Sequence, residues 1–274
     1  MRIFLRSGFE HELASLLFGF PQSPLPATTQ AMPARPIGFP WTEQELQQRV
    51  RSAVIGYWAG RSGQATKQEI GTDRGRRGEV TGGQHMSAFE SLITEVAQHA
   101  GFSEDEIRRG SRVDVPGYYR PSKQWDILIL KRDRLCAALE MKSQVGPSFG
   151  NNANNRTEEA IGSAQDLWLA FREGLLGTHP PFLGYFFFLE ESDGSTRSVR
   201  ADTSTFDVDP VFVGASYAKR YEILCERLVL ERNYNAASLL LSPRGAEGIF
   251  REPNGELSFR RFVKSLWGHL ISCD

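Results

Sequence analysis

One stretch, Trp125 to Lys142, constrains the fold of this chain more than any other. It reads WDILILKRDRLCAALEMK, two short apolar runs that are separated by the polar segment from Lys131 to Arg134. Short hydrophobic runs bounded by charged residues are typical of adjacent strands in a buried sheet, so the stretch predicts a β-hairpin. The first requirement on the fold is therefore a buried antiparallel pair of strands.

The two predicted strands bring charged side chains to one edge of this apolar sheet. Alternate residues of a strand share a face, so Glu140 and Lys142 point the same way with Met141 opposite. If the hairpin closes at residues 131–134, Asp126 lies across from Glu140. Such charges cost free energy beside a core unless a partner such as Mg2+, which prefers oxygen ligands, compensates them. The group predicts a metal-dependent nuclease site, and a structural Glu–Lys pair at a strand end is the alternative.

The bulk properties of the chain narrow the possible function classes. A length of 274 residues, with 40% hydrophobic and 24% charged residues, is typical of a globular protein with one large domain or one domain with additions. A formal net charge of −1 argues against a non-specific nucleic-acid coat protein but allows a locally basic cleft. Three unclustered cysteines and five histidines without ligand spacing predict a reducing compartment, no disulfide framework and no zinc site. No segment is apolar enough to span a membrane or serve as a signal peptide, so we expect a cytoplasmic protein.

Two segments of the chain differ in character. Residues 1–40 hold six prolines between Pro21 and Pro40 and show little periodicity, which predicts an extended or disordered arm. A true start at Met32 is the alternative interpretation of this arm. Residues 41–274 form the predicted nuclease domain.

Hydrophobic periodicity predicts the elements of this domain. Helices are expected at 42–58, 87–100, 157–174, 217–231 and 258–271, and strands at 113–119, in the hairpin, at 182–190 and at 236–242. Capping boxes are expected at Thr42 with Glu45 and at Ser87 with Glu90. The order of helix, three strands, helix and strand from 87 to 190 predicts an α/β fold with a mixed central sheet flanked by helices.

Three further groups of polar residues are candidates for the site. Glu95 has no local role in its helix and could reach a metal through water, although a solvated helix face is the alternative. A glycine-rich segment at 71–83 is either a solvated loop or a clamp on the DNA backbone, and its basic residues are Arg74, Arg76 and Arg77. The segment 143–156 is almost without apolar residues, and a loop this polar is costly to order unless it binds something; a mobile surface loop is the alternative. Its candidates for contacting base edges and phosphates are Gln144, Asn151, Asn152, Asn154, Asn155 and Arg156.

Three segments of the chain carry a resemblance to a known family: WDILIL, ALEMKSQVGPSFGNNANNRTEEAIGSAQDLW and GASYAKRYEILCERLV. Over these segments, and from about Thr42 to the C-terminus, the chain resembles the XhoI-type type II restriction endonucleases of the PD-(D/E)xK nuclease superfamily. The resemblance implies a restriction-endonuclease-like fold and Mg2+-dependent cleavage of double-stranded DNA at the palindrome CTCGAG, after the first C.

The resemblance also implies roles for individual residues. By position, the metal-binding acids of the superfamily fall on Asp126 and Glu140 and its catalytic lysine falls on Lys142, with the backbone carbonyl of Met141 as a further metal ligand. The proline that usually precedes the first acid is absent, because Trp125 occupies that position.

The partners follow from the same resemblance. A palindromic target implies a two-fold homodimer that presents one active site to each strand. A cognate DNA methyltransferase in the same restriction-modification system is also expected. Two alternatives stay open: a catalytically silent nuclease-fold DNA-binding scaffold, and a non-specific repair nuclease. An intact set of Asp126, Glu140 and Lys142 disfavours the scaffold.

Overall fold

The computed structural model describes residues 38–70, 84–132, 134–201, 203 and 205–273. The chain divides into two units, Met1–Ala34 and Arg35–Asp274, and the architecture below belongs to the second unit. Most of the predicted N-terminal arm lies outside the described residues, and so do Arg74, Arg76 and Arg77.

A five-stranded sheet with the order β1-β4-β5-β6-β7 forms the centre of this unit. Its strands are β1 (Ile107–Arg109), β4 (Ile127–Lys131), β5 (Arg134–Gln144), β6 (Phe182–Glu190) and β7 (Ala236–Ser242). The pairs β1–β4 and β4–β5 are antiparallel, whereas β5–β6 and β6–β7 are parallel. The sheet is therefore mixed, as predicted. Two shorter strands, β2 (Asp114–Pro116) and β3 (Ser122–Gln124), form a separate antiparallel hairpin.

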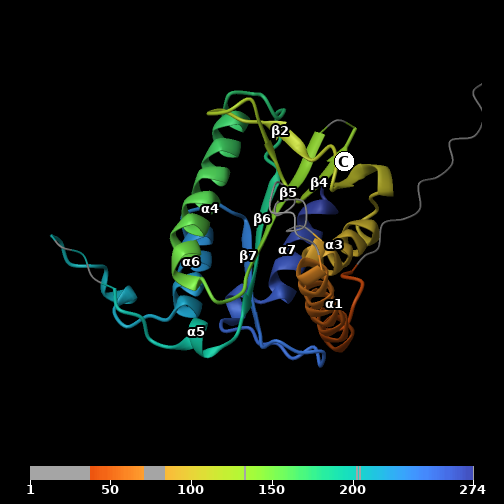
Figure 1. Ribbon diagram of the computed structural model, residues 1–274. Helices are drawn as coiled ribbons and strands as arrows, with labels where there is room; N and C mark the ends of the chain where they lie inside the picture. Colours follow the sequence, from red (N-terminus) through yellow and green to blue (C-terminus); the bar gives the residue numbers. More distant parts are fainter. Residues whose placement is uncertain (1–37, 71–83, 133, 202, 204, 274) are drawn as a thin grey trace, which may run out of the picture. The chain divides into compact units, whose positions relative to one another are not determined.

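Helices cover both faces of the central sheet (Figure 1). On one face the core contains residues of α1 (Glu43–Ile70), α3 (Ser87–His99) and α7 (Phe259–Leu270). On the other face it contains residues of α4 (Phe149–Arg172) and α6 (Tyr217–Leu230), while the short α5 (Asp193–Thr196) follows β6. No helix in these described ranges is long and apolar enough to cross a membrane.

The central strand β6 shows why the sequence predicts this layered fold. All nine residues of FLGYFFFLE are buried, which is typical of a strand covered on both faces. Phe186 and Phe188 pack into the α1–α3–α7 side, and Tyr185 and Phe187 pack into the α4–α6 side. The alternation follows from the two-residue period of a strand.

Most of the predicted elements are confirmed. The β4–β5 hairpin, β6, β7, α6 and α7 lie where the periodicity places them. The capping box at the start of α1 is also present, since the Thr42 N–H donates to Glu45 Oε2 at 2.8 Å and the Glu45 N–H donates to Thr42 Oγ1 at 3.3 Å. The predicted strand at 113–119 is shortened to β2, and β1 and β3 were not predicted.

The prediction of a polar loop at 143–156 was wrong. Strand β5 continues to Gln144, and after a cis Gly146–Pro147 bond α4 begins at Phe149. Asparagine has only modest helix propensity, but burial of Phe149 and Ala153 against α6 and the sheet fixes the helix in spite of it.

The prediction of a capping box at Ser87 was also wrong. A 3-10 turn at Gln84–Met86 leads directly into α3, and the N-cap residue Met86 has helical backbone angles and no side-chain cap bond. Glu90 therefore has no capping role, and its carboxyl group is explained by a different environment below.

Candidate active site

The candidate site lies where β5 extends beyond its antiparallel partner. Strand β4 begins at the pair Ile127–Leu139, and β5 continues past that pair. Asp126 stands at this junction: its N–H donates to the Leu139 carbonyl at 3.1 Å, and its Oδ2 accepts the Met141 N–H at 2.6 Å. The side chain of Asp126 thus occupies the open edge of β5, next to Glu140.

Glu140 is a buried carboxylate with both oxygens bound to ammonium groups. Oε1 lies 2.5 Å from Lys142 Nζ, and Oε2 lies 2.7 Å from Lys123 Nζ. Burial by itself would raise the pKa of Glu140, but the charges of Lys142 and Lys123 outweigh burial and hold that pKa below its ordinary value. Burial would lower the pKa of Lys142, but Glu140 and Asp126 outweigh it and raise that pKa. Glu140 and Lys142 are both charged at neutral pH.

Asp126 is the less well compensated carboxylate of the pair. Burial and the neighbouring Glu140 charge raise the pKa of Asp126 to about 6, against the opposing effects of Lys142 and the Met141 N–H. Additional positive charge at this position would therefore be favourable.

A third carboxylate reaches this region from α3. Burial and the Asp126 charge raise the pKa of Glu90 to about 7. Glu90 and Glu95 are five residues apart, which is about 140° around a helix, so the two side chains face different directions. Glu95 forms an ion pair with Arg49 of α1 on a partly exposed surface, and the structure does not bring it to Asp126. The sequence indicated that Glu90 faces inward, because Glu90 and the buried Ile93 are three residues apart and lie on the same face of α3.

Lys123 also belongs to the candidate site, although the sequence did not predict it. It belongs to β3, donates to the Gln124 carbonyl at 2.9 Å as well as to Glu140, and lies 4.4 Å from the centre of the Trp125 ring. No spacing relates Lys123 to Glu140, because their contact depends on how the small hairpin folds against β5. A lysine two residues before the Trp125–Asp126 pair is the only local signal.

The oxygen donors present fit a hard divalent cation. Asp126 and Glu140 offer carboxylate oxygens side by side, and the raised pKa of Asp126 indicates a place where a cation would be stabilised. Because both Glu140 oxygens contact lysines, a cation would share that carboxylate with Lys123 or Lys142. Among the described residues, no group of three or more His, Cys, Asp and Glu side chains is arranged to hold a metal ion.

Gln144 is a buried structural residue whose side chain links the end of β5 to the start of α4 and to α6. Its Nε2 donates to the carbonyls of Ser148 and Phe149 at 3.1 and 2.9 Å, and its Oε1 accepts from the Tyr221 hydroxyl. The residue is buried, so its amide fixes the β5–α4 connection instead of facing solvent.

Four of the other polar candidates form one stripe on the first turns of α4. Asn151 and Asn155 are four residues apart, as are Asn152 and Arg156, so their side chains lie on adjacent rows of the helix. The charge of Arg156 acts on Lys142 by opposing the rise of its pKa, which places Arg156 on the active-site side of α4. Asn151 and Asn155 are exposed, Asn152 is half-buried, and Arg156 also forms an ion pair with Glu159 at 2.6 Å.

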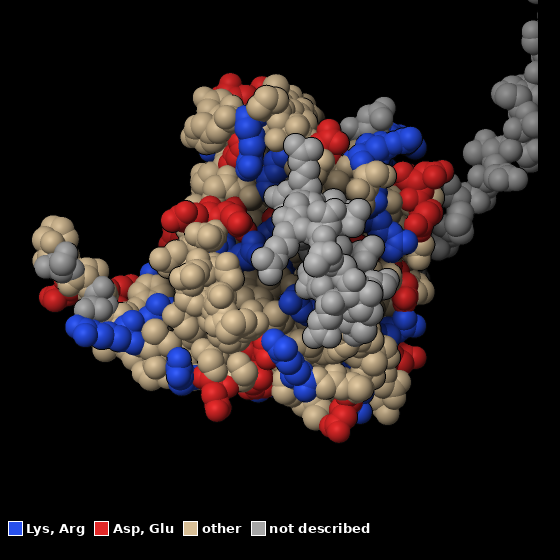
Figure 2. Space-filling view, in the orientation of Figure 1, with Lys and Arg blue, Asp and Glu red and all other residues tan. Residues whose placement is uncertain are grey.

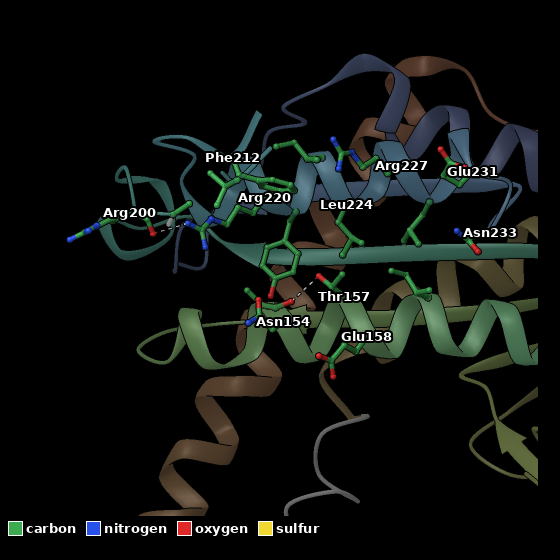
Figure 3. A pocket seen from close by; sticks show the side chains of 17 residues that line it. Asn154, Thr157, Glu158, Arg200, Phe212, Arg220, Leu224, Arg227, Glu231 and Asn233 are labelled. Atoms are coloured by element: carbon green, nitrogen blue, oxygen red, sulfur yellow. Dashed lines mark hydrogen bonds between the residues drawn. The ribbon is translucent and has the colours of Figure 1, made fainter. Parts of the chain in front are cut away.

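Asn154 faces a cavity of about 690 Å3 between α4 and α6, shown in Figure 3. Thr157, Leu224 and Arg227 are among the residues that line this cavity. Asp126, Glu140 and Lys142 do not line it, so it is separate from the carboxylate site. Figure 2 shows further Lys and Arg atoms on the face of the molecule that it draws, between the side of α4 and the side of α1 and α3.

Comparison with known proteins gives independent information about the chain. A family model described as "Restriction endonuclease XhoI" matches residues 65–252. The type II restriction enzyme BstVI of Geobacillus stearothermophilus is 46% identical over 214 residues, which cover 75% of this chain and 96% of that protein. The type II restriction enzyme XhoI of Xanthomonas vasicola is 43% identical over 202 residues, which cover 73% of this chain and 82% of that protein. The type II restriction enzyme AbrI of Azospirillum brasilense is 43% identical over 164 residues, which cover 58% of this chain and 73% of that protein. No solved structure matches the chain.

Proposed function

Because this chain belongs to the XhoI family of restriction endonucleases and is a site-specific deoxyribonuclease, we propose that it cuts double-stranded DNA at the palindrome CTCGAG, after the first C. The observation that carries phosphodiester hydrolysis is the contact of Glu140 with Lys142 beside Asp126, at the open edge of β5, and the family likeness supports the choice of target sequence. These residue types on adjacent strand ends are suited to hydrolysis of a phosphodiester, and the mixed sheet flanked by helices is a restriction-endonuclease-like fold.

We further propose that the cofactor is Mg2+, held by the carboxylates of Asp126 and Glu140 and the backbone carbonyl of Met141. When bound, Mg2+ supplies Lewis-acid polarisation of the scissile phosphate. The hard carboxylate oxygens and the raised pKa of Asp126 support this assignment. The charge of Asp126 acts on Glu90, whereas Glu95 pairs with Arg49, so Glu90 replaces Glu95 in this proposal as the acid that neighbours the metal-binding pair.

Lys142 acts in this proposal as a hydrogen-bond donor. Its raised pKa keeps Nζ protonated at neutral pH, so Nζ can orient the attacking water or donate to a phosphate oxygen. The contact with Glu140 Oε1 at 2.5 Å holds Nζ in place. The contact of Lys123 with the other oxygen restrains rotation of the Glu140 carboxylate. Strands β5 and β3 therefore hold Lys142 and the Glu140 carboxylate in place.

The DNA contacts that we propose begin on α4. Asn151, Asn152 and Asn155 offer donors and acceptors for base edges, and Arg156 suits a phosphate. The arginines at 74, 76 and 77 are proposed to contact the DNA backbone. We propose no DNA contact for Gln144, because it is buried, and none for Asn154, because it faces the cavity beside α6.

The symmetry of a palindrome suggests the assembly. Two equivalent strands require two equivalent active sites, so we propose a two-fold homodimer. A DNA methyltransferase of the same system would protect the host copies of the sequence, and both proteins would act in the cytoplasm, on cellular and incoming DNA. Sedimentation of a dimer with a cognate duplex supports this assembly, and a monomer in the same measurement contradicts it.

A supercoiled plasmid with a single CTCGAG tests the proposed reaction. We expect one double-strand cut, with TCGA overhangs, in the presence of Mg2+ and none in EDTA. The matched control is a plasmid in which one base of the site is changed, and it should stay uncut. Cleavage of both plasmids would instead identify a non-specific nuclease. Specific binding without cleavage would identify a silent DNA-binding scaffold.

A further inference from the structure

The tip of the β2–β3 hairpin presents two exposed tyrosines as a pair. Tyr118 is 48% exposed and Tyr119 is 73% exposed, and their ring centres lie 5.0 Å apart in an edge-to-face arrangement. Solvent-exposed aromatic side chains are common at binding surfaces, because their rings offer a large apolar area. The hydroxyl group of a tyrosine adds a polar contact. An ordered pair of this kind is a candidate contact surface.

A buried carboxylate fixes the backbone that carries these rings. Asp166 of α4 is 3% exposed, and its Oδ1 accepts the N–H groups of both Tyr118 and Tyr119 at 2.8 Å each. Its Oδ2 accepts from Arg120 Nε at 2.7 Å. Burying a carboxylate is costly without such bonds, so the turn and Asp166 stabilise each other.

Close packing around Gly117, at the start of the turn, also fixes the backbone of the turn. A Cβ atom on Gly117 would lie 2.7 Å from Asp166 Oδ2 and 2.8 Å from the Arg120 carbonyl, so only glycine fits there. The turn therefore has little freedom to move, and the two rings project from a preorganised support. Preorganised aromatic residues lose little conformational entropy when they bind a partner.

The other end of this hairpin is attached to the active site. Lys123 of β3 contacts the Glu140 carboxylate at 2.7 Å, and the Trp125 N–H donates to the Val113 carbonyl at 2.9 Å. Lys123 comes four positions after Tyr119, which is roughly 13 Å at full extension, and the bends at 118–121 make the actual distance shorter. The full extension equals about four base pairs of duplex DNA at about 3.4 Å each.

We propose that Tyr118 and Tyr119 contact the DNA duplex within about four base pairs of the cleaved phosphate. This inference rests on the proposed function, since it places the DNA at Asp126 and Glu140. The rings pack against the sugars and groove edges, and the hydroxyl groups contact phosphates.

Position favours DNA over a second copy of the chain as the partner of this tip, because the same hairpin reaches Glu140 through Lys123. Two of the three basic side chains between Arg112 and Gln124 are already paired with carboxylates, Lys123 with Glu140 and Arg120 with Asp166. The exposed aromatic rings near the proposed cleavage site suit a polymer with apolar sugars and bases.

The test is the affinity of Tyr118→Ala/Tyr119→Ala for a labelled cognate duplex in Ca2+, measured by fluorescence anisotropy. We expect at least a tenfold loss of affinity, with KM for cleavage in Mg2+ raised by a similar factor and kcat little changed. Tyr118→Phe/Tyr119→Phe should retain most of the affinity, because the rings remain. The matched control is Phe206→Ala, which removes an aromatic ring that is 81% exposed on another segment, and its affinity should equal that of the wild type.

Three outcomes would overturn the inference. The first is wild-type affinity in the double alanine variant. The second is equal loss in Phe206→Ala. The third is conversion of a wild-type dimer to a monomer by the double variant, which would make the tip a subunit contact. Thermal unfolding checks that the variant is folded, and Tyr119→Ala alone is the fallback if the double variant is not. Failure of the wild type to bind or cut the cognate duplex would instead reject the proposed function.

Discussion

Lys123 Nζ lies 2.7 Å from Glu140 Oε2, although the two residues belong to different sheets. This contact gives the buried carboxylate a second ammonium group besides Lys142, so the negative charges of Asp126 and Glu140 are matched by two lysines. The charge balance of the metal-free site thus depends on a residue outside the strand pair that holds the other members. That dependence can be measured.

Lys123→Met should lower the free energy of unfolding in EDTA by about 2–4 kcal/mol, because it removes one partner of a buried charge. Urea unfolding measures the loss. Added Ca2+ should restore more stability to this variant than to the wild type, since a cation replaces the missing charge. The matched control is Lys131→Met, which breaks the ion pair with Glu106 at 2.8 Å. The stability lost in Lys131→Met should not be restored by Ca2+. An equal gain of stability from Ca2+ in the two variants would contradict the prediction.

Asp126→Asn, Glu140→Gln and Lys142→Met should each reduce cleavage of the cognate plasmid by roughly a hundredfold to a thousandfold. Each change removes a charge from the site that we propose for the scissile phosphate. Lys142→Met should still bind the cognate duplex in Ca2+. Glu95→Gln serves as the control, because Glu95 pairs with Arg49 away from these residues. Near-normal cleavage by any one of the three variants would remove that residue from the mechanism.

The stability of the metal-free protein should fall as the pH rises through the range set by Glu90. The pKa of Glu90 is raised from 4.5 to about 7 by burial and by Asp126, so the folded state binds this proton more tightly than the unfolded state. The contribution is fully present below about pH 4.5 and is lost as the pH rises through about 7. After allowance for partial exposure, the loss is about 1–2 kcal/mol.

Melting temperatures in EDTA across this pH range check the prediction for Glu90. Glu90→Gln should reduce the decline, because the amide does not titrate, and the decline that remains belongs to Asp126, whose pKa is raised to about 6. Glu95→Gln should follow the wild-type curve, since Glu95 lies on another face of α3. Identical curves for all three proteins would show that Glu90 has an ordinary pKa.

Gln144→Ala should cost stability and leave sequence preference unchanged. The substitution leaves the Tyr221 hydroxyl and two carbonyl groups without their amide partner, which costs about 2 kcal/mol. Asn152→Ala is the contrasting variant, since loss of a base contact reduces discrimination by about 1–3 kcal/mol. Competition between CTCGAG and singly altered duplexes measures preference. A change of preference in Gln144→Ala would show that its side chain contacts bases after all.

A truncated protein that starts at Met32 should keep the melting temperature and the specific activity of the full chain. It retains Phe39, whose ring packs 5.7 Å from Trp41 and 6.1 Å from Trp267. A protein that starts at Thr42 loses Phe39 and Trp41 and should be about 2–4 kcal/mol less stable. Loss of folding in the Met32 protein would show that residues before it support the domain.

The sequence predicted those parts of the site that depend on local pairing. Asp126, Glu140 and Lys142 come together because one hairpin aligns them, and strand alternation is enough to show it. Glu90 and Lys123 were missed for a different reason, since each reaches the site from an element that only the tertiary fold brings near. The start of α4 was misplaced because asparagines predict a loop, whereas burial of Phe149 decides the outcome.

The bond from the Met141 N–H to Asp126 has a consequence for how this enzyme can lose activity. At 2.6 Å, the Asp126 carboxylate occupies the place of the carbonyl that a longer β4 would have offered to β5. A carboxylate that we propose as catalytic and that also completes a sheet cannot be exchanged freely, because most replacements leave the Met141 amide exposed to solvent exchange. Asparagine keeps an oxygen acceptor, so Asp126→Asn should preserve the slow amide exchange of Met141, whereas Asp126→Ala should accelerate it. A relative that abandoned catalysis would thus be expected to keep an aspartate or asparagine at this position for the integrity of its sheet.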